Sequence, residues 1–129
     1  MARKRSVVLT DGELRLMRVL WERGRATVGE VVDGLKGPHK PAYNTVLTLL
    51  RILENKGYVT HEKAGRAFVF VPVLNRSQAR RSAVRLLLSR FFDDSPTALV
   101  LNLLEQDSID QAELQRVREL IAAHERSAP

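Results

Sequence analysis

A change of periodicity in residues 41–73 sharply limits the folds open to this chain. The first half predicts a helix from Pro41 to about Lys56, because Pro suits a first helical position and apolar residues recur at three- and four-residue intervals. Gly57 ends that helix. The segments YVTHEK and AFVFVPV then predict two strands joined around Ala64-Gly65, where Gly supplies the positive φ of a tight turn.

Capping boxes mark the starts of three other helices. In such a box Thr or Asp is followed three residues later by Glu, and the two side chains satisfy backbone N–H groups of the first turn. The boxes begin at Thr10, Thr27 and Asp110, and the pair Ser95-Pro96 predicts one more helix start. The expected helices are 11–23, 28–35, 75–92, 95–106 and 111–125.

The order of these elements predicts a mainly α protein with a small β-hairpin wing. Three short helices followed by a hairpin are the layout of a winged helix-turn-helix, whose third helix enters the major groove of DNA while the hairpin lies along the backbone. We expect this domain in residues 1–76 and a three-helix C-terminal dimerisation region in residues 77–129.

Positive charge is concentrated in the first of these regions. Residues 1–76 carry 14 Lys and Arg against 7 Asp and Glu, whereas residues 77–129 carry 7 against 8. Clustered positive charge favours a polyanion such as nucleic acid, although basic faces also occur on proteins without such a partner.

The expected third helix has one polar side that suits contact with bases. Asn44, Thr48, Arg51 and Asn55 fall within an arc of roughly 60° on the side opposite the apolar stripe. Asn can pair with adenine, a Thr methyl group can touch the thymine methyl, and Arg suits guanine or a phosphate. Any surface helix has a polar side, so this pattern also fits a helix that binds nothing. Phosphate contacts are expected from Lys63, Arg66 and the leading Arg3, Lys4 and Arg5.

The C-terminal helices hold many large apolar residues. The segments SAVRLLLSRFF, ALVLNLL and LQRVRELI contain more of them than three short helices can bury among themselves. They predict a homodimer, since proteins that read DNA grooves commonly pair their sites by two-fold symmetry. A compact helical tail without a partner is the alternative.

Composition excludes several classes of function. The chain has no Cys, so disulfides, zinc ribbons and thiolate metal sites are unavailable. No apolar run is long enough for a membrane span or a signal peptide, so we expect a cytoplasmic protein without membrane insertion. His39, His61 and His124 are scattered and match no catalytic or metal-binding spacing. We expect no enzyme activity, no metal and no cofactor.

Four segments, in order, resemble the BlaI/MecI/CopY family of penicillinase-type transcriptional repressors. They are LTDGELRLMRVLWERGRATVGEVVDGL, AYNTVLTLLRILENKGYV, KAGRAFVFVP and LVLNLLEQDSIDQAELQRVRELI, and the similarity extends over about residues 9–121. The resemblance implies a homodimer on a palindromic double-stranded DNA operator. It places the recognition helix at residues 42–53, with contacts from Ala42, Tyr43, Asn44, Thr45, Thr48 and Arg51 and with Lys63 and Arg66 on the wing.

The same resemblance implies a mode of induction. In antibiotic-sensing members a membrane sensor metalloprotease leads to cleavage of the repressor between Asn and Phe. The matching position here is Asn102-Leu103, with Leu in place of Phe. The cysteine pairs of the copper-responsive branch are missing. Two alternatives to a sequence-specific repressor remain: a winged-helix module that binds a protein, and an architectural protein that binds DNA without sequence preference.

Overall fold

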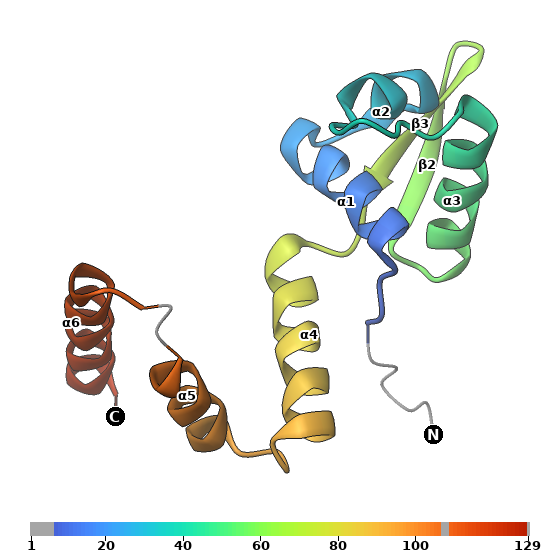
Figure 1. Cartoon of the computed structure of the whole chain (residues 1–129). Coiled ribbons are helices and arrows are strands. Elements are labelled where there is room, and N and C mark those ends of the chain that lie inside the picture. Colours follow the sequence, from blue (N-terminus) through green and yellow to red (C-terminus); the bar gives the residue numbers. More distant parts are fainter. Residues whose placement is uncertain (1–6, 107–108, 129) are drawn as a thin grey trace, which may run out of the picture. The chain divides into compact units, whose positions relative to one another are not determined.

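Six helices and three strands make up the computed structural model, which describes residues 7–106 and 109–128 (Figure 1). The chain divides into two compact units, one ending at Val84 and the other beginning at Arg85. This division falls inside a helix. The boundary expected between residues 76 and 77 stays a prediction.

The N-terminal unit combines three helices with a small antiparallel sheet. The helices are α1 (Asp11–Arg23), α2 (Val28–Gly34) and α3 (Tyr43–Asn55), and the strands are β1 (Ala26–Thr27), β2 (Val59–Ala64) and β3 (Ala67–Pro72). The central strand is β3, which pairs with β1 on one side and with β2 on the other. The short β1 was not expected, because two residues are too few to show an alternating pattern.

Each helix of this unit buries one apolar stripe in a shared core. α1 contributes Leu16, Met17 and Leu20, α3 contributes Val46, Leu50 and Leu53, and further buried side chains come from α2 and the sheet. At the edge of this core the Trp21 indole N–H donates to the carbonyl of Leu74, 2.8 Å away. The apolar periodicity of the sequence therefore predicted the buried face of α3.

Capping boxes start α1 and α2 as expected. The hydroxyl groups of Thr10 and Thr27 accept hydrogen bonds from the backbone N–H of Glu13 and Glu30, and each Glu carboxylate accepts from the backbone N–H of its Thr. The pKa values of Glu13 and Glu30 both lie below the ordinary value of a Glu carboxyl group. For Glu30 the main cause is the hydrogen bond from the Thr27 backbone.

The predicted start of α3 at Pro41 is wrong by two residues. Ala42 has extended backbone angles, φ −69° and ψ 159°, and its carbonyl accepts the first hydrogen bond of the helix from Val46 N–H. Pro41 therefore lies outside the helix. The preceding loop is held in place by hydrogen bonds from Arg15 to backbone carbonyls, contacts that no local pattern reveals.

The hairpin formed by β2 and β3 projects beyond the three helices (Figure 1). Ala64 pairs with Ala67, so Gly65 and Arg66 form a two-residue turn, and Gly65 takes a positive φ of 63°. Every residue from Thr60 to Phe68 is exposed. The hairpin is therefore anchored at its base and exposed to solvent along its length, as expected for a wing.

Glu13 and Lys56 form a buried contact between the start of α1 and the end of α3. The Glu13 side chain is almost fully buried, and Lys56 Nζ lies 2.8 and 3.0 Å from its two carboxylate oxygens. Burial alone would raise the pKa of Glu13, but hydrogen bonds from Lys56 and Thr10 outweigh it and lower that pKa. Glu13 is thus held as a carboxylate inside the core.

The remaining helices are α4 (Arg76–Phe91), α5 (Pro96–Glu105) and α6 (Gln111–Ser127). Side chains cap the start of each one: Asn75 and Gln78 form a box before α4, Ser95 caps α5 and Asp110 caps α6. After α4 both Asp93 and Asp94 have positive φ, a conformation that Asp tolerates better than most residues. The starts of α4, α5 and α6 all lie within one residue of the predicted starts.

The predicted fold class is confirmed. The protein is mainly α with a small hairpin wing, and three helices precede the hairpin and three follow it. Across the described ranges 7–106 and 109–128, each helix is too short or too polar to cross a membrane.

We expect Lys56→Met to destabilise the protein by about 2 kcal/mol at pH 7, because it leaves the Glu13 carboxylate buried without its cation. In the wild type, the lowered pKa of Glu13 contributes stability that is complete above its unfolded pKa of about 4.3 and is lost as pH falls. In the variant Lys56 no longer lowers that pKa, so the difference between the two proteins should shrink as pH falls and Glu13 takes up a proton. Urea unfolding at several pH values measures this difference.

Arg23→Met is the matched control. Arg23 lies 4.0 Å from Glu30, which forms the same kind of capping box, but both of these side chains are exposed to solvent. An exposed pair of this kind contributes little, so the change should stay within about 0.5 kcal/mol. Equal losses in the two variants, or a loss for Lys56→Met that does not change with pH, would contradict this account.

Candidate nucleic-acid interface

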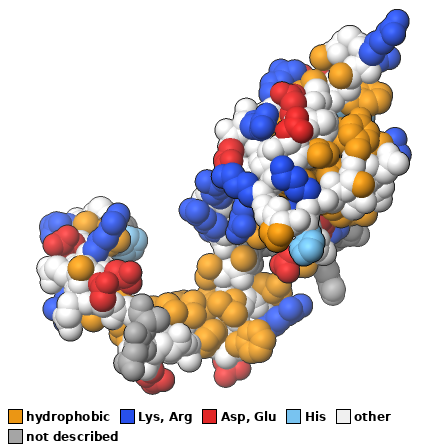
Figure 2. Space-filling view, turned by 45° about the horizontal axis from the view of Figure 1, so that its top comes forward, with side chains coloured by type: hydrophobic (Ala, Val, Ile, Leu, Met, Phe, Trp, Pro, Cys, Tyr) orange, Lys and Arg blue, Asp and Glu red, His pale blue; other side chains and the backbone are white. Residues whose placement is uncertain are grey.

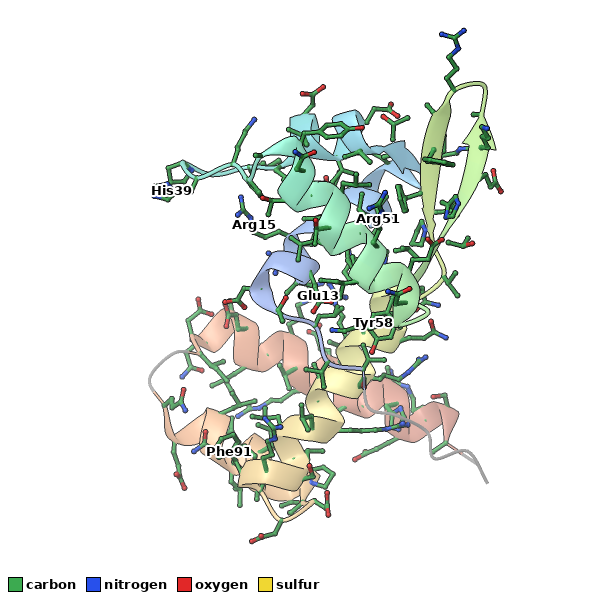
Figure 3. All side chains as sticks on the ribbon, turned by 90° about the vertical axis from the view of Figure 1, so that its right-hand side faces the viewer. Glu13, Arg15, His39, Arg51, Tyr58 and Phe91 are labelled. Carbon is green, nitrogen blue, oxygen red and sulfur yellow. The ribbon has the colours of Figure 1, made fainter. Side chains whose placement is uncertain are left out.

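The polar arc of α3 is exposed along the whole helix. Val46, Leu50 and Leu53 are buried, so the opposite side of the helix faces solvent. That side carries the four residues of the predicted arc, Asn44, Thr48, Arg51 and Asn55. In Figure 3 α3 faces the viewer with Arg51 in front of the core. The structure thus brings these side chains together on one surface, and their contact with bases stays a prediction.

The first turn of α3 is exposed as well. Ala42, Tyr43 and Thr45 all face solvent, and the Tyr43 side chain is 54% exposed. Ala42 at the N-cap has no side-chain oxygen and makes no capping hydrogen bond. The first backbone N–H groups of α3 therefore lack the side-chain acceptor that Thr10 and Thr27 provide for α1 and α2.

Thr48 forms a hydrogen bond within its own helix. Its hydroxyl group donates to the carbonyl of Asn44, 2.9 Å away. With its hydrogen used in this way, the hydroxyl oxygen can only accept a further hydrogen bond, and it cannot donate one to a ligand. Thr48 therefore offers an acceptor and a methyl group to whatever lies against α3.

The wing carries exposed basic side chains. Arg66 lies in the two-residue turn, and Lys63 lies opposite Phe68 on the strand that enters the turn. Figure 2 shows Lys and Arg side chains at the tip of the hairpin. The other expected phosphate contacts, Arg3, Lys4 and Arg5, lie outside the described residues.

Two side-chain pairs tie the wing to the rest of the unit. His61 on β2 lies within hydrogen-bonding distance of the Glu54 carboxylate on α3, and its ring packs edge-on against Phe68 with centroids 5.1 Å apart. Arg25 and Glu62 form an exposed ion pair of 3.4 Å. Sequence analysis missed both pairs, because each joins residues whose proximity depends on the fold.

Acidic residues are missing from a long stretch that includes this surface. Between Asp33 and Glu54 the sequence has no Asp or Glu, and this interval contains the loop before α3 and nearly all of α3. Lys36, Lys40 and Arg51 lie in the same interval. The absence of carboxylates is visible in the sequence and could have extended the predicted interface into the loop.

The helices that follow the wing expose large apolar side chains. No residue of α4, α5 or α6 is buried within the described structure. Phe91 is 74% exposed and Leu120 is 62% exposed, and eight more Val, Leu and Ile side chains are also exposed: Val84, Leu87, Val100, Leu101, Leu103, Leu104, Val117 and Ile121. Figure 2 shows such side chains along the C-terminal unit. Leaving this much apolar surface in water is unfavourable, and the homodimer expected from the sequence stays a prediction.

Asn102 and Leu103 lie in α5, three residues or fewer from its last residue, Glu105. Both residues are exposed, and the Asn102 side-chain oxygen accepts a hydrogen bond from the Gln106 amide, 2.9 Å away. Within residues 7–106 and 109–128, no three His, Asp or Glu side chains gather where they could hold a metal ion.

Comparison with known proteins supports the same interpretation. Residues 9–123 match the model of the penicillinase repressor family. The penicillinase repressor of Bacillus licheniformis is 29% identical over 116 residues, which span 90% of this chain and 91% of that protein. The transcriptional regulator BlaI of Mycobacterium tuberculosis is 30% identical over 125 residues, which span 94% of this chain and 91% of that protein.

Among solved structures, the DNA-binding domain of the repressor BlaI is 32% identical, with a TM-score of 0.50. The match covers 59% of this chain and 93% of that domain. The family expected from sequence resemblance is confirmed: this chain belongs to the penicillinase repressor family of winged-helix, DNA-binding transcriptional repressors.

Proposed function

We propose that this repressor binds a palindromic operator as a homodimer, with α3 of each subunit in the major groove and the wing on the DNA backbone. The observation that carries the proposal is the exposed, acid-free polar face of α3 beside a basic hairpin tip. A helix fits into a major groove about 12 Å wide, where each base pair presents its own pattern of donors and acceptors.

Different side chains of α3 suit different bases. Arg51 extends from the middle of α3 and suits the two acceptors of guanine, whereas Asn44 near its start suits adenine. Thr48 can accept a hydrogen bond from an adenine or cytosine amino group, because its own hydrogen is already bound to the Asn44 carbonyl. Tyr43 and Thr45 lie at the first turn, at the mouth of the groove.

Phosphate contacts hold α3 in register. Lys63 and Arg66 are exposed on the wing and carry charge without base specificity. The backbone N–H groups that follow Ala42 have no side-chain cap and point out of the helix start, where a phosphate oxygen can accept from them. These contacts would strengthen binding to every DNA sequence about equally.

The dimer is proposed to form through α4, α5 and α6. Each Val, Leu, Ile or Phe side chain that is fully buried contributes about 1.5–3 kcal/mol, and these helices expose ten of them. A second copy of the chain offers the same apolar surface, which is what a two-fold interface requires. A two-fold dimer then presents two α3 helices to two half-sites of opposite orientation.

Arg51→Ala should weaken binding to the operator by about 1–3 kcal/mol and relax preference at one base pair of each half-site. Lys63→Ala should weaken binding to operator and scrambled duplexes alike, because it removes a phosphate contact. Fluorescence anisotropy with duplexes that carry every substitution at each position measures both effects. Arg126→Ala, an exposed Arg near the end of α6, is the control and should bind as the wild type does. If Arg51→Ala lost affinity equally for all sequences, α3 would not be reading bases.

Paired Leu104→Asp and Leu120→Asp substitutions should convert the dimer into a monomer, because they place charges on exposed apolar side chains of α5 and α6. Light scattering after size-exclusion chromatography measures the mass. The matched control replaces two exposed polar residues of the same helices, Thr97→Asp and Gln115→Asp, and should stay dimeric. A monomeric wild type would contradict the proposed dimer, and so would a dimer that survives both Leu substitutions.

Induction is proposed to proceed by cleavage between Asn102 and Leu103 after a signal from a membrane sensor metalloprotease. Both residues are exposed close to the end of α5, where opening a single helical turn would free the peptide bond. Cutting there would separate α6 from the rest of the chain and remove part of the proposed dimer surface. The free energy that holds two copies on the operator would fall accordingly.

Peptide mass spectrometry on cells before and after induction tests the cleavage. We expect a fragment that ends at Asn102 and another that begins at Leu103. Asn102→Ala should abolish the cut. Gln106→Ala loses the same Asn102–Gln106 hydrogen bond but keeps the residue before the cut, so it should still be cleaved. An intact chain throughout induction would overturn this part of the proposal.

A further inference from the structure

Arg15 of α1 forms hydrogen bonds with the backbone of the loop that precedes α3. Its guanidinium Nη2 donates to the carbonyl of Lys36 at 2.9 Å, and both terminal nitrogens lie 3.3 Å from the carbonyl of His39. A planar guanidinium with several fixed donors can hold two carbonyls in one geometry, which the single ammonium of Lys cannot do. Figure 3 shows Arg15 directed toward the segment that carries His39.

The backbone of this segment is restricted at several points. Leu35 is buried and anchors its start, and Gly37 takes a positive φ of 115° that a side chain would strain. Pro38 and Pro41 fix their own φ angles near −65°. The segment is therefore shaped locally by Gly and Pro and attached to α1 by Arg15.

All five residues from 36 to 40, which we call the basic loop, are exposed. Lys36 and Lys40 supply two positive charges, and the loop lies in the interval between Asp33 and Glu54 that has no acidic residue. The hydrogen bonds to Arg15 use backbone carbonyls, so they leave the Lys side chains free to bind an anion.

The basic loop and the wing lie on opposite sides of α3. In Figure 3, where α3 faces the viewer, the segment with His39 is to the left of the helix and the hairpin is to the right. A helix in the major groove has a phosphate backbone on each side of it. The wing is placed to reach one of these backbones, and the basic loop is placed to reach the other.

We propose that Arg15 is a positioning residue that holds the basic loop so that Lys36 and Lys40 bind DNA phosphates on the side of α3 opposite the wing. This inference rests on the proposed function and adds a second phosphate site to it. Both terminal nitrogens of Arg15 donate to the carbonyls of Lys36 and His39, so its role in this proposal is to hold the loop. Its effect on affinity passes through the two Lys residues.

The test compares full-length variants by fluorescence anisotropy on the operator and on a scrambled duplex as salt is raised. Lys36→Gln with Lys40→Gln should lower affinity for both duplexes about 10-fold or more and reduce the slope of log K against log salt by about two, since each phosphate contact contributes about 0.9. Arg126→Gln removes a charge near the end of α6 and should leave the slope unchanged.

Arg15→Lys separates positioning from charge. It keeps the positive charge but loses the planar guanidinium that holds two carbonyls, so we expect it to bind DNA as weakly as Arg15→Gln does. Both variants should keep the thermal midpoint of the wild type within a few degrees. Added to the Lys36→Gln and Lys40→Gln variant, Arg15→Gln should cause no further loss, because the residues that it positions are gone. Additive losses, or wild-type affinity in Arg15→Lys, would overturn the positioning role.

The two levels of the proposal fail differently. If the wild type prefers its operator but the paired Lys variant keeps the wild-type salt slope, the basic loop does not bind phosphate and the repressor function stands. If the wild type shows no preference among duplexes, the proposed function is overturned and this inference with it.

Discussion

The carboxylate of Glu13 is the one charge enclosed in the core of the N-terminal unit as described, and the geometry of α3 depends on how it is satisfied. It accepts hydrogen bonds from Lys56 Nζ at the end of α3 and from the Thr10 backbone at the start of α1. Because a buried carboxylate without partners is costly, any shift of α3 that broke the contact with Lys56 would be opposed. One helix is thereby fixed against another at the end of α3 farthest from its first turn.

With its far end fixed, α3 can carry two different surfaces. Leu50 and Leu53 pack inward, and the side that bears Arg51 remains in solvent. The pair formed by Glu54 and His61 then places the wing beside this surface. Recognition of a groove requires side chains held in fixed positions. Here α3 is fixed by its packed apolar side and by the contacts Glu13–Lys56 and Glu54–His61.

Sequence patterns predicted the parts of this arrangement that depend on neighbours along the chain. The capping boxes at Thr10 and Thr27, the two faces of α3 and the turn at Gly65 all follow from local spacing. The start of α3 was missed by two residues because the backbone of Ala42 is extended and Ala42 is the N-cap, which a Pro at position 41 does not reveal. The contacts Glu13–Lys56 and Glu54–His61 could not be predicted either, since they appear only when α1, α3 and β2 are brought together. For the C-terminal helices the sequence predicted the elements and their excess of apolar residues, while the surface that covers them belongs to a second molecule in our proposal.

The central claim is that α3 reads a DNA sequence, and selection of sites by the purified protein from a pool of random duplexes tests it most directly. The selected duplexes should be re-tested against scrambled competitors as salt is raised, because phosphate contacts alone weaken equally for all sequences. We expect an inverted repeat that keeps its advantage over the competitors throughout. A pool with no enriched sequence, and binding that fades uniformly with salt, would contradict the account.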